Sequence, residues 1–236
     1  MHKLLVVQAD PVAGQEAEYL DWYRTKHLCD HVSIPSVESG RMYRQDSALD
    51  GTSGHSYVVA YEVSDPAKMM ELLTERRRNP QHEARSSYAI DRANATMAII
   101  AALEGVLRLP QQPGADGPDP GIAILHLPVA EAQQPGFSSD YAQRFLPSLL
   151  GAAGVASGAV FGLDDFQYSA APKPSHYVLL VLSDTALAAK ALAGLALAPD
   201  AVRSAPSYRA LIYRAILPTL THAGAVAQAK AEGVTW

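Results

Sequence analysis

The sequence has few of the features that mark secreted, membrane-bound or nucleic-acid-binding proteins. Its 236 residues contain one cysteine, Cys29, so no disulfide can form within the chain, as is usual in a reducing compartment. The net charge is −5 and the longest basic run is Arg76-Arg77-Arg78, which disfavours nucleic acid and anionic membranes as partners. The first apolar stretch, Leu4 to Val7, is too short for a signal peptide or a membrane span. We therefore expect a soluble, cytoplasmic protein.

Common cofactor and nucleophile motifs are also missing. The sequence has no paired cysteines that could bind a metal and no nucleophile elbow of the hydrolase type. The stretch Gly151-Ala152-Ala153-Gly154 lacks the preceding strand and following helix that a phosphate-binding loop requires. These absences disfavour nucleotide cofactors and serine hydrolysis, and we expect no cofactor.

What the sequence does contain is an internal repeat. Without a gap, residues 4–7 (LLVV) align with 122–125 (IAIL), and residues 36–40 (SVESG) align with 154–158 (GVASG). With one residue of slippage, which a loop can absorb, Tyr57-Val58-Val59 aligns with Tyr177-Val178-Leu179. A repeat of this length indicates two similar small domains in one chain.

Each half predicts the order strand, helix, strand, strand, helix, strand, which is ferredoxin-like. In the first half the second helix opens at Asp65, a good N-cap, followed by Pro66 at the first helical position. The expected strands of the first half cover 4–8, 40–45, 56–63 and 93–103, and its first helix covers 15–32. The second half predicts strands at 122–127, 155–161, 177–182 and 208–216, and helices at 139–150 and 185–195.

We predict an α+β protein with a first ferredoxin-like unit at 1–108, a Pro/Gly linker at 109–120, a second unit at 121–218 and a partly helical tail at 219–236. A four-stranded sheet with both helices on one face leaves its other face bare. We therefore expect the two sheets to pack face to face and to enclose a barrel-like cavity.

A polar cluster on the first predicted helix distinguishes the two halves. Side chains three and four apart share a helix face, so Tyr23, His27, Asp30 and His31 form one stripe. At the same offset the second half carries phenylalanine in place of His27 and serine in place of Asp30. The second unit is therefore degenerate, and we expect any chemistry to belong to the first half.

These residues resemble a known family. The motif Trp22-Tyr23, His27, Asp30 and Pro35, followed by the run 39–43 (SGRMY), resembles the dimeric α/β-barrel superfamily, most closely its EthD-like and polyketide-cyclase-like branch. The resemblance implies two ferredoxin-like units that share a cavity, here fused in tandem. It also implies cofactor-free dehydratases, decarboxylases, cyclases and isomerases, or cofactor-independent monooxygenases, that act on ring-containing small molecules. In EthD-like members the histidine that matches His27 is the best candidate for proton transfer, although the usual Pro-Gly is Pro35-Ser36 here.

An imidazole, with an ordinary pKa of about 6.5, can give and take a proton at neutral pH. We predict a cofactor-independent lyase or isomerase that acts on a hydrophobic, ring-containing small molecule, with His27 as the proton carrier and Asp30 as its orienting acid. Two alternatives stay open, namely a non-catalytic small-molecule-binding or stress-related module and a cofactor-free monooxygenase. The charge-poor second half is scaffold or an oligomer surface, compatible with a homodimer.

Further substrate contacts are predicted on the helix and on the second and third strands. His55 could be a second proton carrier or an exposed hairpin residue, and Arg41 could hold a carboxylate or enolate oxygen or form a surface ion pair. Alternate residues of a strand share one face, which predicts one wall for the candidates of the third strand. The full set is Tyr23, Arg41, Tyr43, His55, Tyr57 and Tyr61.

A metal site is a weaker alternative. His27 and His31 are four residues apart and could ligate one ion, with Cys29 or Asp30 as a third ligand. No glutamate follows the first histidine as in a metalloprotease helix, and the family that the sequence resembles mostly uses no metal. We therefore predict no metal.

Overall fold

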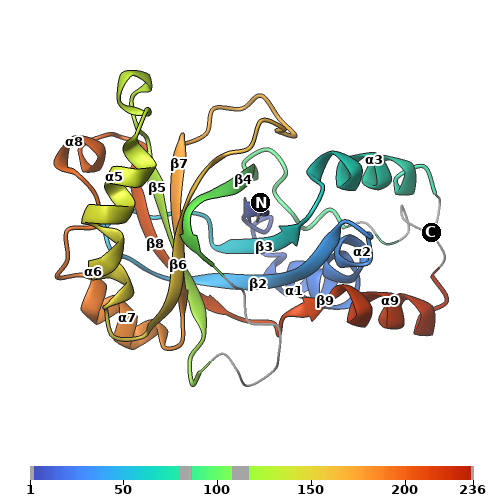
Figure 1. The fold of residues 1–236 in the computed structure, drawn as a ribbon. Helices are drawn as coiled ribbons and strands as arrows, with labels where there is room; N and C mark the ends of the chain where they lie inside the picture. The colour runs from blue at the N-terminus through green and yellow to red at the C-terminus, as the bar shows by residue number, and fades with distance from the viewer. Residues whose placement is uncertain (1–2, 80–84, 86, 108–116, 235–236) are drawn as a thin grey trace.

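The computed structural model describes residues 3–79, 85, 87–107 and 117–234 (Figure 1). The strands are β1 (Lys3–Ala9), β2 (Val37–Ala48), β3 (Tyr57–Val63), β4 (Thr96–Val106), β5 (Gly121–Leu127), β6 (Val155–Leu163), β7 (His176–Leu182), β8 (Arg209–Ala215) and β9 (Leu220–Thr221). The helices are α1 (Glu16–Trp22), the π-helix η1 (Tyr23–His27), α2 (Leu28–Val32), α3 (Pro66–Arg76), the short 3-10 helix η2 (Glu131–Gln133), α5 (Phe137–Arg144), α6 (Leu146–Leu150), α7 (Thr185–Leu192), α8 (Asp200–Arg203) and α9 (His222–Ala231). Most of the expected linker lies outside the described residues.

Eight of the strands close into an antiparallel barrel. Their order is β3-β1-β4-β6-β7-β5-β8-β2, and β2 pairs again with β3. The two halves meet at β4–β6, where Ile100 lies opposite Leu163, and at β2–β8, where Tyr43 lies opposite Ala215. Because these edges are hydrogen-bonded, one continuous closed sheet replaces the expected pair of sheets stacked face to face, and no barrel strand keeps a bare edge.

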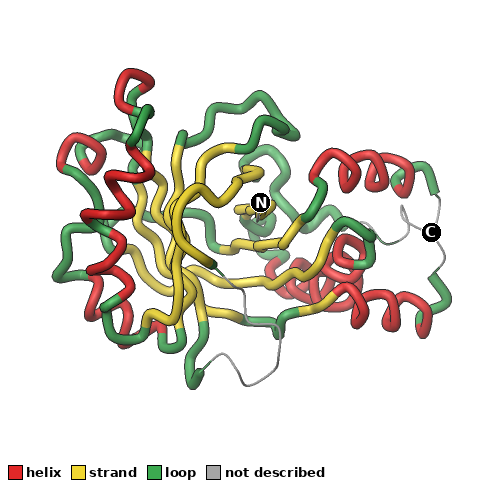
Figure 2. Tube along the Cα trace, viewed as in Figure 1, coloured by secondary structure: helices red, strands yellow, loops and turns green. Residues whose placement is uncertain are grey.

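Strand alternation sorts the apolar side chains into an inner and an outer layer. Leu4 and Val6 of β1 and Val58 of β3 belong to the cluster inside the barrel. Their neighbours Leu5 and Val59 face outward, into a cluster that they share with the helices of the first half. Helices cover the barrel on opposite sides, α1, α2, α3 and α9 on one and α5 to α8 on the other (Figures 1 and 2). The first group forms the layer in which the predicted stripe lies.

A close approach at Gly40 fixes α2 against the sheet. A Cβ atom at this position would lie 2.7 Å from Val32 Cγ2 and 2.8 Å from Tyr61 Cδ1. Gly158, its partner in the repeat, is equally crowded, with Leu180 Cδ2 at 2.5 Å from such a Cβ. The repeated Ser-Gly pair thus lets the helix and the sheet touch in both halves.

The predicted helices exist, but two of them are interrupted. The helix expected at 15–32 contains the π turn η1, and the one expected at 139–150 breaks at Phe145 between α5 and α6. The second break follows from Pro147, which has no backbone N–H to donate and clashes with the preceding turn. The predicted cap is confirmed, because the Asp65 side chain accepts a hydrogen bond from the Lys68 backbone N–H at 2.9 Å.

The C-terminal helix α9 returns to the first half and packs on α2. His222 Nδ1 lies 2.8 Å from the carbonyl oxygen of Val32, and the Cys29 thiol donates to the carbonyl oxygen of Ala225 at 3.2 Å. The tail is therefore part of the layer that holds the candidate site.

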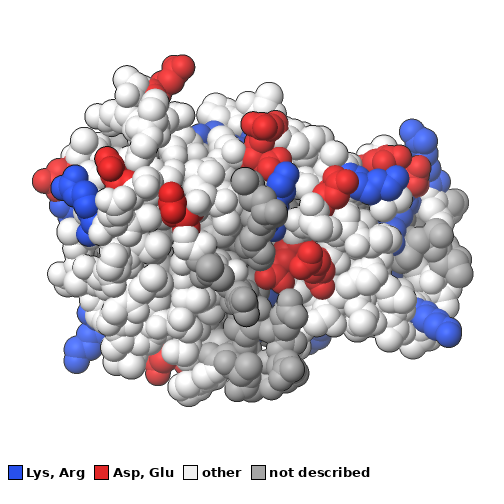
Figure 3. All heavy atoms as spheres, in the orientation of Figure 1, with Lys and Arg blue, Asp and Glu red and all other residues white. Residues whose placement is uncertain are grey.

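The distribution of charge on one face and the lengths of the described helices bear on the partners of the protein. Basic and acidic side chains are interspersed on the face drawn in Figure 3. Within the part of the chain that the structure describes, no helix combines the length and the apolar character needed to cross a bilayer.

Candidate functional site

One π-helical turn shapes the helix that carries the predicted stripe. The backbone N–H of Leu28 donates to the carbonyl of Tyr23, five residues earlier, instead of to the residue four earlier as in an α-helix. Side chains five apart diverge by about 140° on an α-helix, whereas the wider π turn brings them together. The imidazole of His27 consequently lies on the indole of Trp22, with ring centroids 4.0 Å apart.

Five aromatic and imidazole rings follow one another from this turn to the sheet, and we call them the ring series: Trp22, Tyr23, His27, His31 and Tyr61. His27 meets Tyr23 edge-on at 4.7 Å and meets His31 at 4.1 Å between centroids. His31 stacks on Tyr61 at 5.5 Å. Tyr23 and Tyr61 are buried, while both histidines are half-buried. The ring series therefore presents two imidazoles on an aromatic wall between the helix and the outer face of the barrel.

The surroundings of His31 select one tautomer of its neutral ring. Its Nδ1 lies 3.0 Å from the carbonyl oxygen of His27, an atom that can only accept a hydrogen bond. Neutral His31 therefore carries its hydrogen on Nδ1, and Nε2 is the atom that accepts a proton. Two adjacent imidazoles can in this way divide the roles of general acid and general base.

The second half repeats this ring pair without an imidazole. Tyr141 stacks on Phe145 with 5.1 Å between ring centroids, close to the 4.7 Å between Tyr23 and His27. The spatial match supports the gap-free alignment of the halves. Of these two matched ring pairs, the one in the first half contains the titratable imidazole.

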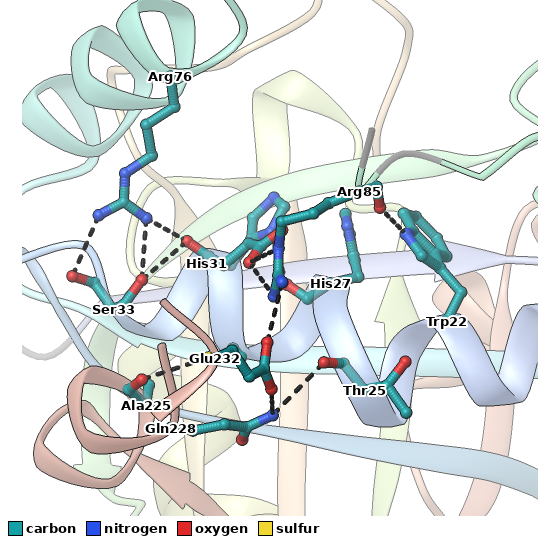
Figure 4. Close-up of polar contacts among 12 residues, drawn as sticks. Trp22, Thr25, His27, His31, Ser33, Arg76, Arg85, Ala225, Gln228 and Glu232 are labelled. Atoms are coloured by element: carbon teal, nitrogen blue, oxygen red, sulfur yellow. Dashed lines mark hydrogen bonds and ion pairs between the residues drawn. The ribbon is translucent and has the colours of Figure 1, made fainter. Parts of the chain in front are cut away.

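Asp30, the predicted orienting acid, is buried and paired with Arg85. Arg85 Nε lies 2.8 and 3.1 Å from the two carboxylate oxygens, and Nη2 lies 2.8 Å from Oδ1. Arg85 Nη1 also reaches Glu232 at 2.9 Å, and its backbone carbonyl accepts the Trp22 indole N–H at 2.7 Å (Figure 4). Burial alone would lower the pKa of Arg85, but the two carboxylates hold it above its ordinary value. Sequence patterns did not indicate this arginine, which joins Asp30 and Trp22 to the C-terminal segment.

A second arginine completes the surroundings of Asp30. Arg76, at the end of α3, donates to the backbone carbonyl of Asp30 and, at 2.9 Å, to Ser33 Oγ (Figure 4). Burial lowers the pKa of Arg76 to about 10, so it remains a cation at neutral pH. A cation at this place complements the C-terminal end of α2 as well as that of its own helix.

The tyrosine hydroxyls of this layer stay protonated at neutral pH. Burial raises the pKa of Tyr61 well above its ordinary value, and the charge of Asp30 adds to the effect. Burial also raises the pKa of Tyr23, and it raises that of Tyr57 to about 12. The Tyr61 hydroxyl has no hydrogen-bond partner among the described residues. It is therefore a donor that a polar atom of a bound molecule could satisfy.

The predicted substrate contacts do not share one wall. Tyr57 and Tyr61 face the helix layer, so they do not line the barrel cavity. Tyr43 belongs to the inner cluster of the barrel, and Arg41, two residues earlier on β2, points to the same side. Arg41 is buried, and its Nε donates to the carbonyl oxygen of Leu217 at 3.0 Å. Helices cover the face of the sheet that carries Tyr57 and Tyr61, so this face does not line the cavity.

His55 lies at a different place again. It precedes β3, which begins only at Tyr57, so strand alternation does not apply to it. Its Nδ1 lies 2.8 Å from Asp10 Oδ2, and both residues line a cavity of about 390 Å³ at one end of the barrel. The structure therefore separates His55 from the ring series.

The pair His27 and His31 gains no third metal ligand from the described residues. No group of three or more His, Cys, Asp and Glu side chains in this part of the chain is placed to hold a metal ion. Cys29 instead donates to Ala225, and burial raises the pKa of its thiol to about 11. Asp30 is engaged by Arg85.

Comparison with known proteins supports the fold. No protein-family model and no curated protein matches the sequence. An anthrone oxidase-like protein of known structure superposes with a TM-score of 0.64 and 11% identity, covering 94% of this chain and 93% of that chain. A protein from Fusobacterium nucleatum subsp. nucleatum that is proposed to be a monooxygenase has a TM-score of 0.56 and 8% identity over 92% and 93% of the two chains. One from Lactobacillus acidophilus, with the same proposed activity, has a TM-score of 0.53 and 8% identity over 94% and 96%.

The similarity extends over nearly the whole of each chain. It agrees with the closed barrel described above, and the chain therefore has a fold of the dimeric α/β-barrel type. At identities of 8 to 11% this likeness concerns the fold alone. Activity has to be argued from the site.

Proposed function

We propose that this protein is a cofactor-independent enzyme that moves a proton on a hydrophobic, ring-containing small molecule, with His27 as the proton carrier. The observation that carries the proposal is the ring series, in which two half-buried imidazoles lie 4.1 Å apart on an aromatic wall. Aromatic side chains bind planar apolar molecules through offset-stacked and edge-on contacts. Imidazoles beside such a wall can exchange protons with the bound molecule at neutral pH.

Each residue of the site has a distinct part in the proposed reaction. His27 takes a proton from a carbon next to a carbonyl or from a phenol, and the electron pair of the broken bond forms an enolate or phenolate. The Tyr61 hydroxyl donates a hydrogen bond to that oxygen. His31 returns a proton at a second atom, or to a leaving group. Asp30, held by Arg85, is a positioning residue that fixes the helix on which both histidines stand.

The fate of the anion distinguishes two reaction classes. Reprotonation or loss of a leaving group gives a lyase or isomerase of the dehydratase, decarboxylase or cyclase type, which is the first candidate. Oxidation by O₂ is the second candidate, and it is favoured by the anthrone oxidase-like and monooxygenase-type neighbours. In that reaction a ring CH₂ becomes C=O and the other oxygen atom leaves as water. The substrate supplies all four electrons, so no further reductant is needed.

The proposal includes an origin by tandem fusion of two ferredoxin-like units, at 1–108 and 121–218, with the linker and tail as expected from the sequence. Three observations support it, namely the gap-free repeat, the shared Ser-Gly contact at Gly40 and Gly158, and the matching ring pairs. The proposed assignment to the EthD-like branch rests on the motif that ends in Pro35. The proposed cytoplasmic location rests on the single cysteine.

The test is turnover of a panel of aromatic and polycyclic acids and ketones by wild type and His27→Asn. His176→Asn is a matched control, because His176 also contacts an aromatic ring, Phe137 at 5.0 Å, but lies in the second half. Loss of His27 should lower kcat by about 10²–10⁴-fold, whereas the control should keep it. Oxygen uptake that matches product formation would select the oxidase, and turnover without uptake the lyase or isomerase.

Two results would count against an enzyme. Turnover that survives in His27→Asn would remove this residue from the chemistry. Binding of panel members without any turnover would favour a small-molecule-binding module.

A further inference from the structure

The cavity at the barrel end is a concave site that is separate from the ring series. Its volume is about 390 Å³, within the range of small-molecule pockets. It opens on the inner side of the sheet, and no ring-series residue is among the described residues that line it. Its polar and aromatic lining includes Asp10, His55, His126, Lys173, Tyr177 and Arg209.

One wall of the cavity holds an ordered His–Asp pair. His55 Nδ1 lies 2.8 Å from Asp10 Oδ2, and Asp10 Oδ1 accepts the Ser56 backbone N–H at 2.7 Å. Partial burial opposes ionisation of Asp10, but the hydrogen bonds from Ser56 and His55 hold its pKa below the ordinary value. Asp10 is thus a fixed carboxylate that holds Nδ1 of His55 within the lining of the cavity.

The lining of the cavity also contains a buried polar atom without a hydrogen-bond partner among the described residues. His126 Nε2 has no hydrogen bond among the described residues. Burial lowers the pKa of His126 to about 4, with a further effect from Arg209, so its ring is neutral at pH 7. The ring lies edge-on to Tyr177, with centroids 5.3 Å apart. An unsatisfied polar atom of this kind is better explained by a ligand or an ordered water than by packing.

The charges that line the cavity favour an anion. Arg209 and Lys173 contribute two cations against the single carboxylate of Asp10. Both cations donate hydrogen bonds to neutral acceptors of the protein. Arg209 Nη1 donates to the carbonyl oxygen of Pro206 at 2.8 Å. Lys173 Nζ donates to the carbonyl oxygen of Ser169 at 2.6 Å. Neither cation is neutralised by these bonds.

We infer that the barrel end binds a small aromatic carboxylic acid as its anion. The carboxylate would face Arg209 and Lys173, and the ring would lie between Tyr177 and the apolar side chains of Met97 and Leu211. This site is independent of the proton chemistry proposed for His27. It is a binding site on the inner face of the barrel, whereas the ring series is on the outer face.

The test is isothermal titration of the full-length protein with 1-naphthoate and with its neutral analogue 1-naphthamide. The acid should bind at least about tenfold more tightly than the amide, because hydrogen bonds to a charged group are the stronger ones. Arg209→Gln and Lys173→Gln should each weaken the binding of 1-naphthoate, Arg209→Gln by about tenfold or more. Arg203→Gln removes an exposed cation of α8 and should leave binding unchanged.

Several outcomes would overturn the inference. These are equal binding of acid and amide, no detectable binding of 1-naphthoate, or unchanged affinity in both cavity variants. Lys173 lies in the loop before β7, so Lys173→Gln keeps the test decisive if Arg209→Gln misfolds. Binding that is lost in His27→Asn would place the acid at the ring series instead. Binding kept in that variant supports the second site even if the enzyme proposal fails.

Discussion

At the scale of single residues, Arg85 neutralises the buried carboxylate of Asp30 in the candidate site. Asp30 is 2% exposed, and a carboxylate at that depth is tolerated only with a counter-ion and hydrogen bonds. Arg85 supplies both through its Nε and Nη2 atoms. Because Arg85 lies 55 residues from Asp30 in sequence, their pairing depends on the tertiary fold and no local spacing reveals it.

Replacement of Arg85 by Met should therefore be costly. It would remove the cation that contacts the buried carboxylate of Asp30, and the free energy of unfolding should fall by about 3–5 kcal/mol. Arg77→Met removes an exposed guanidinium that donates to the Tyr168 hydroxyl at 2.9 Å, and its effect should stay within about 0.5 kcal/mol. Urea unfolding of both variants measures the difference. A loss below about 1 kcal/mol in Arg85→Met would show that Asp30 does not depend on this pair.

At the scale of elements, the sequence predicted which segments form helices and strands better than it predicted how they are shaped. The helix expected at 15–32 is present, but the π turn at Tyr23–His27 is not visible in hydrophobic periodicity, because it shifts the phase by a single residue. That shift places Trp22 on His27, a contact that the expected α-helical stripe did not include. The N-cap at Asp65, by contrast, depends only on residues close to it in sequence, so it could be predicted.

The C-terminal helix should protect the single thiol of the protein. Cys29 is 1% exposed, donates to Ala225 of α9, and has its pKa raised to about 11 by burial. Truncation after Thr221 should expose Cys29 and increase its rate of reaction with an aromatic disulfide reagent by about tenfold or more, since reaction requires an accessible thiolate. Glu232→Gln, which removes the ion pair to Arg85 but keeps α9, should leave the thiol slow to react. Equal reactivity of truncated and full-length protein would mean that α9 does not cover α2.

At the scale of the whole molecule, closure of the barrel decides which candidates meet. The order of strands within each half follows from the βαββαβ pattern and could be predicted. The junctions β4–β6 and β2–β8 could not, because pairing between sheet edges is set by the geometry of both units. The same uncertainty concerned the two faces of the sheet: an alternating pattern predicts two walls but does not say which one faces the helices. The structure places Tyr57 and Tyr61 on the wall that faces the helices.

His126 should make the stability of the folded protein depend on pH. Its pKa is lowered by burial to about 4, whereas an unfolded chain has a histidine pKa of about 6.5. Between these values the unfolded state binds more protons, so stability that is present above pH 6.5 is lost as the pH falls toward 4. The slope is at most about 1.4 kcal/mol per pH unit, and partial exposure of the side chain reduces it.

In His126→Asn this contribution should disappear. The loss of unfolding free energy between pH 7 and pH 4.5, measured in urea, should therefore be smaller in the variant than in wild type. An identical loss in the two proteins would show that His126 is not held neutral by the fold.

Deuterium exchange tests proton transfer at His27 most directly, because it requires no knowledge of the later reaction steps. Ring ketones such as 2-tetralone and anthrone would be incubated in D₂O with wild type, His27→Asn and His176→Asn, and exchange at the carbon next to the carbonyl would be followed by NMR. The account predicts enzyme-accelerated exchange with wild type and His176→Asn, and a rate lowered by about 10²-fold or more with His27→Asn. Exchange that equals the buffer rate with wild type, or that is undiminished in His27→Asn, would contradict it.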